Sequence, residues 1–297
     1  MGVVSPQRSV LLMVQPRDRR RRAANRVMEV IASVAALLAV AVLLLVIGSV
    51  VVKGVGAINF AFITQNPAPF GQPGGGIANS IVGTAELVGI ASLIAIPIGI
   101  LIGIYTAEFA PPWVGNSVRF ALDILNGVPT IITGVFIFGI LVVGSQQSGW
   151  AGAIALGIVM LPIVARSAQE VLALVPRSLH EAALALGLRR WRVVLRIVLP
   201  TAAGGLVTGA VLGVARVAGE TAPLLFTSSI WSNLGLTSNP GQALPNIPVT
   251  IFTLSESPSP TDHQQAWAAA LVLIFLVFAL SVLARTFHER SRRKLRG

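Results

Sequence analysis

Two opposite charges, Arg216 and Glu220, lie four residues apart at the end of an apolar stretch that also carries Gly205, Gly209 and Gly213. If the stretch is a helix with 100° per residue, all five positions fall within roughly 80° of one another. A charge inside a membrane costs about 2.5–3.5 kcal/mol on insertion scales, so this pair should face protein or water. The glycines would let a neighbouring backbone approach the same face closely.

Two interpretations of this charge pair stay open from position alone. In the first, the pair is an anion-binding element on a translocation path. An arginine about 4 Å from an anion gains roughly 4 kcal/mol at an effective dielectric constant of 20, comparable to the cost of placing it there. In the second, the pair is a structural ion pair that locks two helices near a membrane surface. In both, the four-residue spacing lets the charges neutralise each other.

A second group of candidate residues lies in a basic, amphipathic interruption between two apolar segments, residues 178–200. Ser178 and Glu181 form a capping-box pattern, which predicts the start of a short helix. Gly187 is suited to end that helix in the left-handed conformation. A second helix should follow, with Pro200 in the first turn of the next apolar helix, where its missing N–H has little effect.

The spacing in this interruption is EAA, three residues, G, nine residues and I-x-LP. It resembles, without a departure, the EAA loop of the permeases of ABC importers. The resemblance implies that the loop is a coupling element held in a groove of a cytoplasmic ATPase. On charge alone, a basic loop lying on anionic lipid is the alternative. The positions that carry the pattern are Glu181, Ala182, Ala183, Gly187, Ile197, Leu199 and Pro200.

Composition indicates that both groups belong to an integral membrane protein. Hydrophobic residues make up 54% of the 297 residues and charged residues only 11%, with a mean hydropathy of +0.81. One water-facing globule has no room to hide that much apolar surface. The net charge of +11 falls in linkers between apolar runs, which is typical of membrane topology and not of nucleic-acid binding. The chain has no cysteine, which excludes disulfides, and its three histidines lack the spacing of metal ligands.

The predicted fold is an all-α integral membrane protein with six transmembrane helices. The expected spans are residues 27–52, 80–104, 120–144, 150–166, 201–219 and 266–284. Gly99 and Gly103 should form a close-packing face, and the glycine and proline at 127–129 should interrupt the third span. Around these spans we expect a basic tail at 1–26, an external linker at 53–76, a core at 77–287 and a basic tail at 288–297.

The distribution of Lys and Arg predicts the orientation. With the N-terminus inside, twenty of the 22 Lys and Arg residues fall in inside segments, only Lys53 falls outside, and Arg216 lies within a span. This asymmetry places both termini and the loop at 178–200 in the cytoplasm. Glu108, Asp123 and Glu170 then lie near the inner interface, where we expect ordinary solvated charges.

Three further stretches narrow the resemblance. Residues 76–84, 127–131 and 216–227 are similar to the PstA-type permease of the phosphate-specific ABC importer. The likeness runs from about Gly76 to the end of the sixth span. It implies the MetI-like architecture of type I ABC importer permeases and a role for Arg216 and Glu220 in the passage of phosphate.

An enzymatic function is not expected. The phosphate-binding motif of ATPases needs a Lys followed by Ser or Thr, whereas Lys53 and Lys294 are followed by Gly and Leu. No cofactor is therefore expected on this chain. The resemblance implies that ATP and magnesium bind two cytoplasmic ABC ATPase subunits, which join a paralogous permease and an extracytoplasmic phosphate-binding protein at the cytoplasmic membrane of a prokaryote.

Two alternatives remain. The first is a permease for another oxyanion, sulfate or molybdate. The second is a non-transporting membrane scaffold whose loop docks a cytoplasmic partner. A scaffold has no use for a charge pair on a glycine face within a span, which disfavours it.

Overall fold

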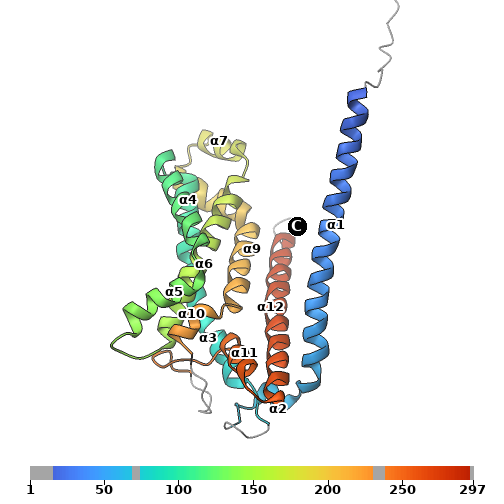
Figure 1. The fold of residues 1–297 in the computed structure, drawn as a ribbon. Coiled ribbons are helices and arrows are strands. Elements are labelled where there is room, and N and C mark those ends of the chain that lie inside the picture. The colour runs from blue at the N-terminus through green and yellow to red at the C-terminus, as the bar shows by residue number, and fades with distance from the viewer. Residues whose placement is uncertain (1–15, 69–73, 230–237, 295–297) are drawn as a thin grey trace, which may run out of the picture. The chain divides into compact units, whose positions relative to one another are not determined.

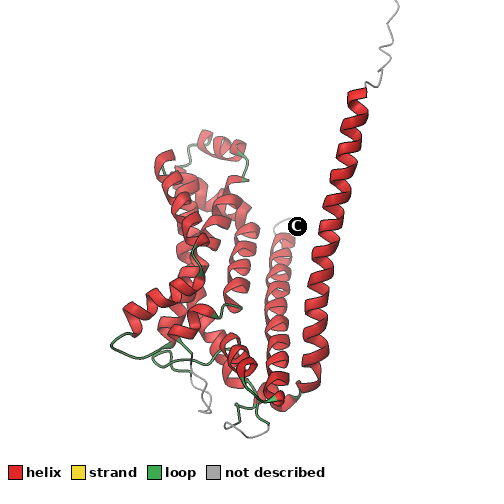
Figure 2. Cartoon of the chain, in the orientation of Figure 1, coloured by secondary structure: helices red, strands yellow, loops and turns green. Residues whose placement is uncertain are grey.

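The computed structural model describes residues 16–68, 74–229 and 238–294, and within these ranges the chain is built from helices without a β-strand (Figure 2). It separates into two compact units, Met1–Ser49 and Val50–Gly297. The described part of the first unit is helix α1 (Pro16–Gly54) as far as Ser49, and the last residues of this helix belong to the second unit. The further elements are η1 (Val55–Ala57), α2 (Phe60–Thr64), α3 (Ala78–Ile104), η2 (Tyr105–Phe109), α4 (Pro112–Gly127), α5 (Thr130–Ile137), η3 (Phe138–Val142), α6 (Gly149–Ala173), α7 (Arg177–Ala185), α8 (Arg190–Val193), η4 (Val194–Val198), α9 (Leu199–Ala218), α10 (Ala222–Thr227), α11 (Ile247–Glu256) and α12 (Pro260–Lys294).

The apolar helices agree with the predicted number of spans. Among the described residues, five helical stretches are long and apolar enough to cross a membrane: 20–57, 78–109, 149–173, 190–218 and 260–282. Helices α4 and α5 meet at 93° and make a sixth span if they are counted together. The break lies at Val128 and Pro129, as predicted, because the residue before a proline is pushed out of the helical conformation.

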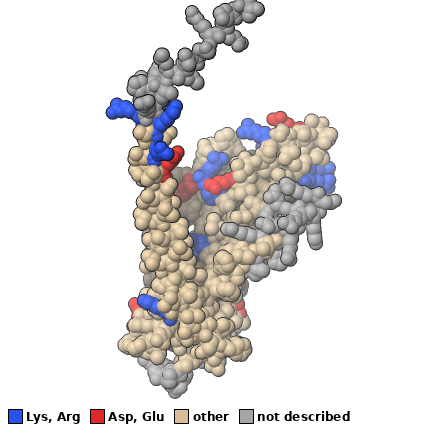
Figure 3. Space-filling view, turned by 90° about the vertical axis from the view of Figure 1, so that its right-hand side faces the viewer, with Lys and Arg blue, Asp and Glu red and all other residues tan. Residues whose placement is uncertain are grey.

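Helix α1 is longer than the span predicted at residues 27–52. It begins at Pro16, inside the predicted basic tail, because Ala and Arg are good helix formers. Residues 1–15 of that tail lie outside the described residues. The side chains of α1 from Arg20 to Val46 are exposed, and Figure 3 shows arginines at the beginning of this helix followed by a long uncharged stretch. A continuous apolar stretch of this length suits a lipid environment.

Helices α3 and α6 pack backbone to backbone. A side chain at Gly99 would begin 2.9 Å from the Cγ1 atom of Val164, and one at Gly103 would begin 2.5 Å from the Cβ atom of Ala168. The predicted close-packing face is therefore confirmed, and α6 is the helix that it meets. Only glycine permits this approach, so the two helices form one rigid layer.

Several predicted helix ends are wrong. Residues 105–119, between the second and third predicted spans, are mostly helical, since η2 continues α3 and only residues 110–111 separate it from α4. Helix α6 continues to Ala173 and does not end at Arg166, whose guanidinium pairs with the carboxylates of Asp123 at 3.7 Å and Glu170 at 3.5 Å. The predicted span ends at Arg166 because of its charge, but a charge that is paired is tolerated inside a helix.

Residues 220–265, between the fifth and sixth predicted spans, contain the helices α10 and α11 and the beginning of α12. Pro223 and Pro248 lie in the first turns of α10 and α11, where a missing N–H leaves no helical hydrogen bond unmade. Residues 230–237 of this segment lie outside the described residues.

The core of the second unit lies between α3, α6 and the end of α9. Leu87, Leu156, Met160 and Val217 are almost fully buried there. Helix α7 lies at one end of this unit and α11 at the other (Figure 1). Charged side chains gather at the end that carries α7 (Figure 3).

Candidate substrate path and coupling site

The glycine face of α9 is the seam between α9 and α6. A side chain at Gly209 would collide with Ser167, and one at Gly213 would begin 2.9 Å from the Cγ2 atom of Val164. Gly205 meets α6 equally closely. The predicted approach of a neighbouring backbone is confirmed, and it fixes the position of the last turn of α9, which carries Arg216.

Arg216 and Glu220 form the predicted ion pair, although Glu220 is not on the helix. Helix α9 ends at Ala218, with Gly219 as its C-cap, so Glu220 follows the helix end. The Nη2 atom of Arg216 lies 3.0 Å from the Oε1 atom of Glu220. The helical-face prediction was therefore wrong for Glu220, because a glycine before it ends the helix.

The two partners of this pair differ sharply in burial. The Glu220 side chain is 9% exposed, whereas that of Arg216 is 59% exposed. The Oε1 atom of Glu220 is buried and accepts no well-aligned hydrogen bond among the described residues, so the contact is an ion pair only. A guanidinium has five N–H donors in a planar fork, and most of those of Arg216 stay accessible.

Arg216 borders a pocket of about 280 Å³ at the break between α4 and α5. The walls come from residues 125–130 at the break, from Thr133 on α5 and from Ile158 and Ile163 on α6. Helix α5 begins there at Thr130, and no side chain caps its start. The pocket therefore combines a guanidinium with the N-terminal end of a half-span, where backbone N–H groups carry partial positive charge.

The second region begins with α7, the first half of the predicted coupling loop. Gly187 has a φ of +78°, so the predicted left-handed end of this helix is confirmed. The Gly187 N–H donates to the Leu184 carbonyl at 2.9 Å, and the Leu188 N–H donates to the Ala183 carbonyl at 3.3 Å. These two bonds form a Schellman motif, which satisfies carbonyls that a helix end otherwise leaves unpaired.

The predicted capping box at Ser178 and Glu181 is wrong. Helix α7 begins at Arg177 with Pro176 before it, and no side chain caps its start. Ser178 is thus already inside the first turn, because Pro176 fixes the extended backbone that precedes the helix.

The second half of the loop is continuous with the fifth span. Residues 190–218 form one helical path, so this span begins well before the predicted Thr201. The wide turn η4 contains Ile197, and the Leu199 N–H donates to the Val194 carbonyl five residues earlier. Such a π-turn adapts the helix to Pro200, which has no N–H and would otherwise clash with the preceding turn.

The EAA residues divide between a buried anchor and an exposed surface. Ala183 is 3% exposed and packs with Leu172, Val193 and Val198. Glu181 and Ala182 are exposed, as are two neighbouring leucines, Leu184 and Leu186. The small residue lets α7 lie close to the bundle, and the exposed apolar side chains of α7 and its end leave a surface for a partner protein.

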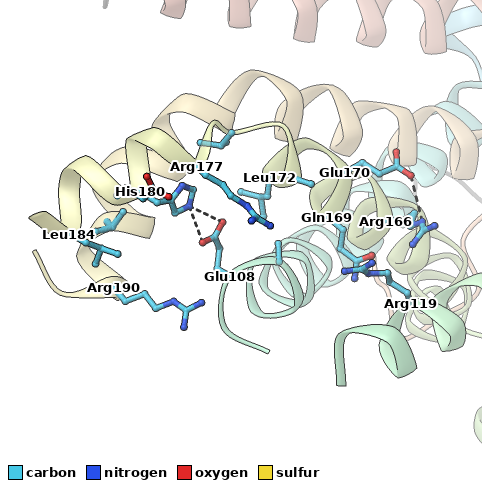
Figure 4. A pocket seen from close by; sticks show the side chains of 15 residues that line it. Glu108, Arg119, Arg166, Gln169, Glu170, Leu172, Arg177, His180, Leu184 and Arg190 are labelled. Atoms are coloured by element: carbon cyan, nitrogen blue, oxygen red, sulfur yellow. Dashed lines mark hydrogen bonds and ion pairs between the residues drawn. The ribbon is translucent and has the colours of Figure 1, made fainter. Parts of the chain in front are cut away.

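A charged pocket of about 830 Å³ is lined by α7, α8, η2, α4 and the second half of α6 (Figure 4). In it, the Nε2 atom of His180 on α7 lies 3.1 Å from the Oε2 atom of Glu108 on η2. The Glu108 side chain is only 10% exposed. Glu108 is thus a buried, paired carboxylate, and its prediction as an ordinary solvated charge was wrong.

Relatives identify the family to which these features belong. A family described as "Binding-protein-dependent transport system inner membrane component" matches residues 99–297. The chain is 38% identical over 98% of its length to the phosphate transport system permease protein PstA of Yersinia pestis, of which it covers 100%. It is 40% identical over 84% of its length to a probable PstA of Methanocaldococcus jannaschii, of which it covers 88%. The chain belongs to the PstA permease family.

Solved structures show the same fold for this PstA family member. The inward-facing MetNI methionine ABC transporter is 18% identical with a TM-score of 0.61, over 72% of this chain and 95% of that one. A bacterial ABC transporter that imports the acidic polysaccharide alginate is 15% identical with a TM-score of 0.63, over 91% of this chain and 99% of that one. The predicted MetI-like architecture is confirmed.

Sequence reasoning missed the link between Glu108 and His180 in this PstA family member. The two residues are 72 positions apart, and nothing in their spacing indicates a contact. The one available signal is that Glu108 directly follows a long apolar run, where a carboxylate requires a partner or water.

Proposed function

We propose that this chain is the PstA-type permease subunit of an ATP-driven importer of inorganic phosphate. The observation that carries the proposal is the full-length likeness to the PstA of Yersinia pestis, a phosphate transport system permease. The complete EAA pattern at residues 181–200 supports an ABC importer independently of that likeness. ATP and magnesium would bind partner ATPases, because this sequence has no ATP-binding motif of its own.

Arg216 is the residue that we assign to phosphate on the path. Its exposed guanidinium borders the pocket at the break of the third span, beside the first turn of α5. Helix N-termini and arginines both favour anions, and a broken half-helix is a common way to place such donors inside a membrane. Glu220 would hold the guanidinium between transport cycles and give it up when the anion arrives.

We assign the coupling role to α7 and the turn after it. Glu181, Ala182 and Gly187 would face the ATPase. Ile197, Leu199 and Pro200 would join the loop to the fifth span. Leu184 and Leu186 would fill apolar hollows on the ATPase. In this assignment ATP-driven closure of two ATPases moves α7, the spans rock, and the path opens outward toward the phosphate-binding protein. A paralogous permease would supply the other half of the path.

The proposed orientation has both termini and α7 in the cytoplasm, where Lys and Arg gather. Because the chain has no cysteine, single cysteines report on it cleanly. A cysteine at Ser238 should react with an impermeant thiol reagent from outside, and one at Ser291 should not. Labelling of Ser291 in intact cells would overturn the orientation.

The function is tested by uptake in the reconstituted complex of both permeases, the ATPases and the binding protein. Labelled phosphate should enter in an ATP-dependent and binding-protein-dependent way, and labelled sulfate and molybdate should not. Preferred uptake of sulfate or molybdate would replace phosphate as the substrate. The absence of any uptake with an assembled complex would leave the scaffold alternative.

A further inference from the structure

The π-turn η2 at the end of the second span is the place where that span contacts the coupling loop. Glu108 receives His180 from α7, with the Nε2 atom 3.1 Å from Oε2 and 3.3 Å from Oε1. The next residue, Phe109, lies beneath the guanidinium of Arg190 on α8, 5.7 Å from its ring centroid. Two adjacent side chains thus each hold one half of the loop.

The contact between Glu108 and His180 is the direct polar link between α7 and the second span. In the ranges that the structure describes, no other hydrogen bond or ion pair joins α7 to α3 or η2. The other anchor of α7 is apolar: Ala183 lies in a cluster with Leu172 and Val193, and Ile104 at the end of the second span packs against the same cluster. A movement of α7 can therefore reach the second span through this directed polar contact as well as through the apolar cluster.

His180 is held at both of its ring nitrogens. Its Nδ1 atom lies 3.4 Å from the Pro176 carbonyl oxygen while Nε2 faces the Glu108 carboxylate. Both neighbours accept hydrogen bonds, so the ring is oriented along the line from the start of α7 to η2. Arg119, Arg177 and Glu181 also line this pocket but form no ion pair among the described residues.

Beyond Glu108, rigid packing continues to the proposed path. Gln169 on α6 donates to the Thr106 hydroxyl of η2 at 2.7 Å, and the glycines of α3 lock that helix to α6. Helix α6 in turn carries Ile158 and Ile163, two walls of the pocket at Arg216. Packed helices of this kind move together, because close packing resists continuous deformation.

We propose that Glu108 and His180 are positioning residues that transmit movement of α7 to the second span and so couple ATP hydrolysis to opening of the path. The proposal rests on the proposed function, since it needs an ATPase that moves α7. The pair acts through α3 and α6 and touches no substrate. Without it, the ATPase should still dock but should no longer drive the path.

The experiment compares single and double leucine substitutions in the reconstituted complex. Glu108→Leu and His180→Leu each remove one partner, and the double variant removes both and with them any unpaired buried charge. All three should assemble with the ATPase and keep basal ATP hydrolysis. Phosphate taken up per ATP hydrolysed should fall roughly 5- to 150-fold, the range of typical coupling energies. His180→Gln, which keeps a donor, should retain most of the coupling.

A merely structural pair predicts a different pattern. If the pair only stabilises the fold, the double leucine variant should recover coupling, because no charge is then left without a partner. Such a recovery would overturn the proposal, as would loss of ATPase docking in the double variant. Glu170→Leu is the matched control, since this exposed carboxylate lines the same pocket, and it should leave coupling within about twofold.

A substrate-free measurement separates this proposal from the proposed function. A cysteine at Thr133 would lie in the wall of the pocket at Arg216, as the only thiol of the subunit. Its labelling rate should change when ATP is added to the parental complex and stay constant with Glu108→Leu. An equal ATP response in both would refute the link, even if the permeant anion is not phosphate.

Discussion

Among the described residues, two buried carboxylates, Glu220 and Glu108, each contact one basic side chain, at different places in the fold. The N–O distances are 3.0 Å to Arg216 and 3.1 Å to His180, and the carboxylate side chains are 9% and 10% exposed. The basic partners differ in exposure, because the Arg216 side chain is 59% exposed and that of His180 only 24%. Arg216 can accept a further anion, whereas His180 is fully engaged. The first pair is thus suited to binding and the second to holding two elements together.

The pairs also differ in how far they reach. Arg216 and Glu220 belong to one segment and lie four residues apart. Glu108 and His180 join two elements 72 residues apart in sequence. Removal of Arg216 should therefore change the affinity of the path for the anion, and removal of His180 should change what the ATPase can drive. The predictions below test that division.

The largest effect is expected at the packing of α3 against α6, because both carboxylate pairs depend on it. Gly103→Leu would place a side chain against Ala168 and the backbone of Gln169, and such overpacking typically costs about 1–3 kcal/mol. Because α3 and α6 separate, phosphate uptake and coupling should both be lost. The measurement is the thermal unfolding midpoint of the purified subunit together with uptake.

Gly89→Leu on the same helix is the control for this scaffold prediction. A side chain there would meet no atom of this chain within 4 Å, so the unfolding midpoint of the isolated subunit should stay close to the parental value. An equal loss of stability in both variants would show that α3 tolerates no leucine at all, and the seam would not be the cause.

The second effect concerns Arg216. Arg216→Gln removes the charge and keeps side-chain length and hydrogen-bonding capacity. Uptake should fall tenfold or more if about 1.4 kcal/mol of barrier stabilisation is lost. Assembly with the ATPase should survive, because α7 is unchanged. Labelled phosphate uptake and co-purification of the ATPase measure the two outcomes.

The double variant Arg216→Gln, Glu220→Gln decides between the two interpretations of this pair. If Arg216 serves the anion, neutralising Glu220 as well should not restore uptake. If the pair only locks helices, the double variant has no unpaired charge and should transport nearly normally. Recovery of uptake in the double variant would show that Arg216 and Glu220, like Glu108 and His180, serve to hold the structure together and that Arg216 does not bind the anion.

The third effect is on the shape of the coupling loop. Gly187→Ala places a side chain at a φ of +78°, which costs about 1 kcal/mol and weakens the turn between α7 and α8. Docking of the ATPase should weaken by a factor of roughly five. Titration of the ATPase onto the reconstituted permease pair measures it, and phosphate affinity should stay unchanged, because no residue of this turn lines the pocket at Arg216.

Local signals in the sequence predicted the contact between Arg216 and Glu220 but not the contact between Glu108 and His180. The glycine seam, the break at residues 127–129 and the contact of Arg216 with Glu220 follow from short-range patterns. The Glu108 link depends on how α3, α6 and α7 pack, which no spacing encodes. Helix ends were misplaced where charges such as Arg166 are paired across helices, because sequence alone shows the charge and not its partner.

The smallest effect distinguishes a sequence pattern from a real cap. Ser178 matches a capping box but lies inside α7 and makes no capping hydrogen bond, whereas the Ser148 hydroxyl accepts from the Ala151 N–H at 3.2 Å at the start of α6. Ser148→Ala should therefore cost about 1 kcal/mol. Ser178→Ala should change stability by less than about 0.5 kcal/mol, as for most exposed positions. Thermal unfolding of the two variants provides the measurement. An equal loss of stability in the two variants would show that Ser178 does cap α7. The start of α7 would then be fixed by this cap as well as by the contact with Glu108. In that case, loss of His180 should uncouple the ATPase less than expected.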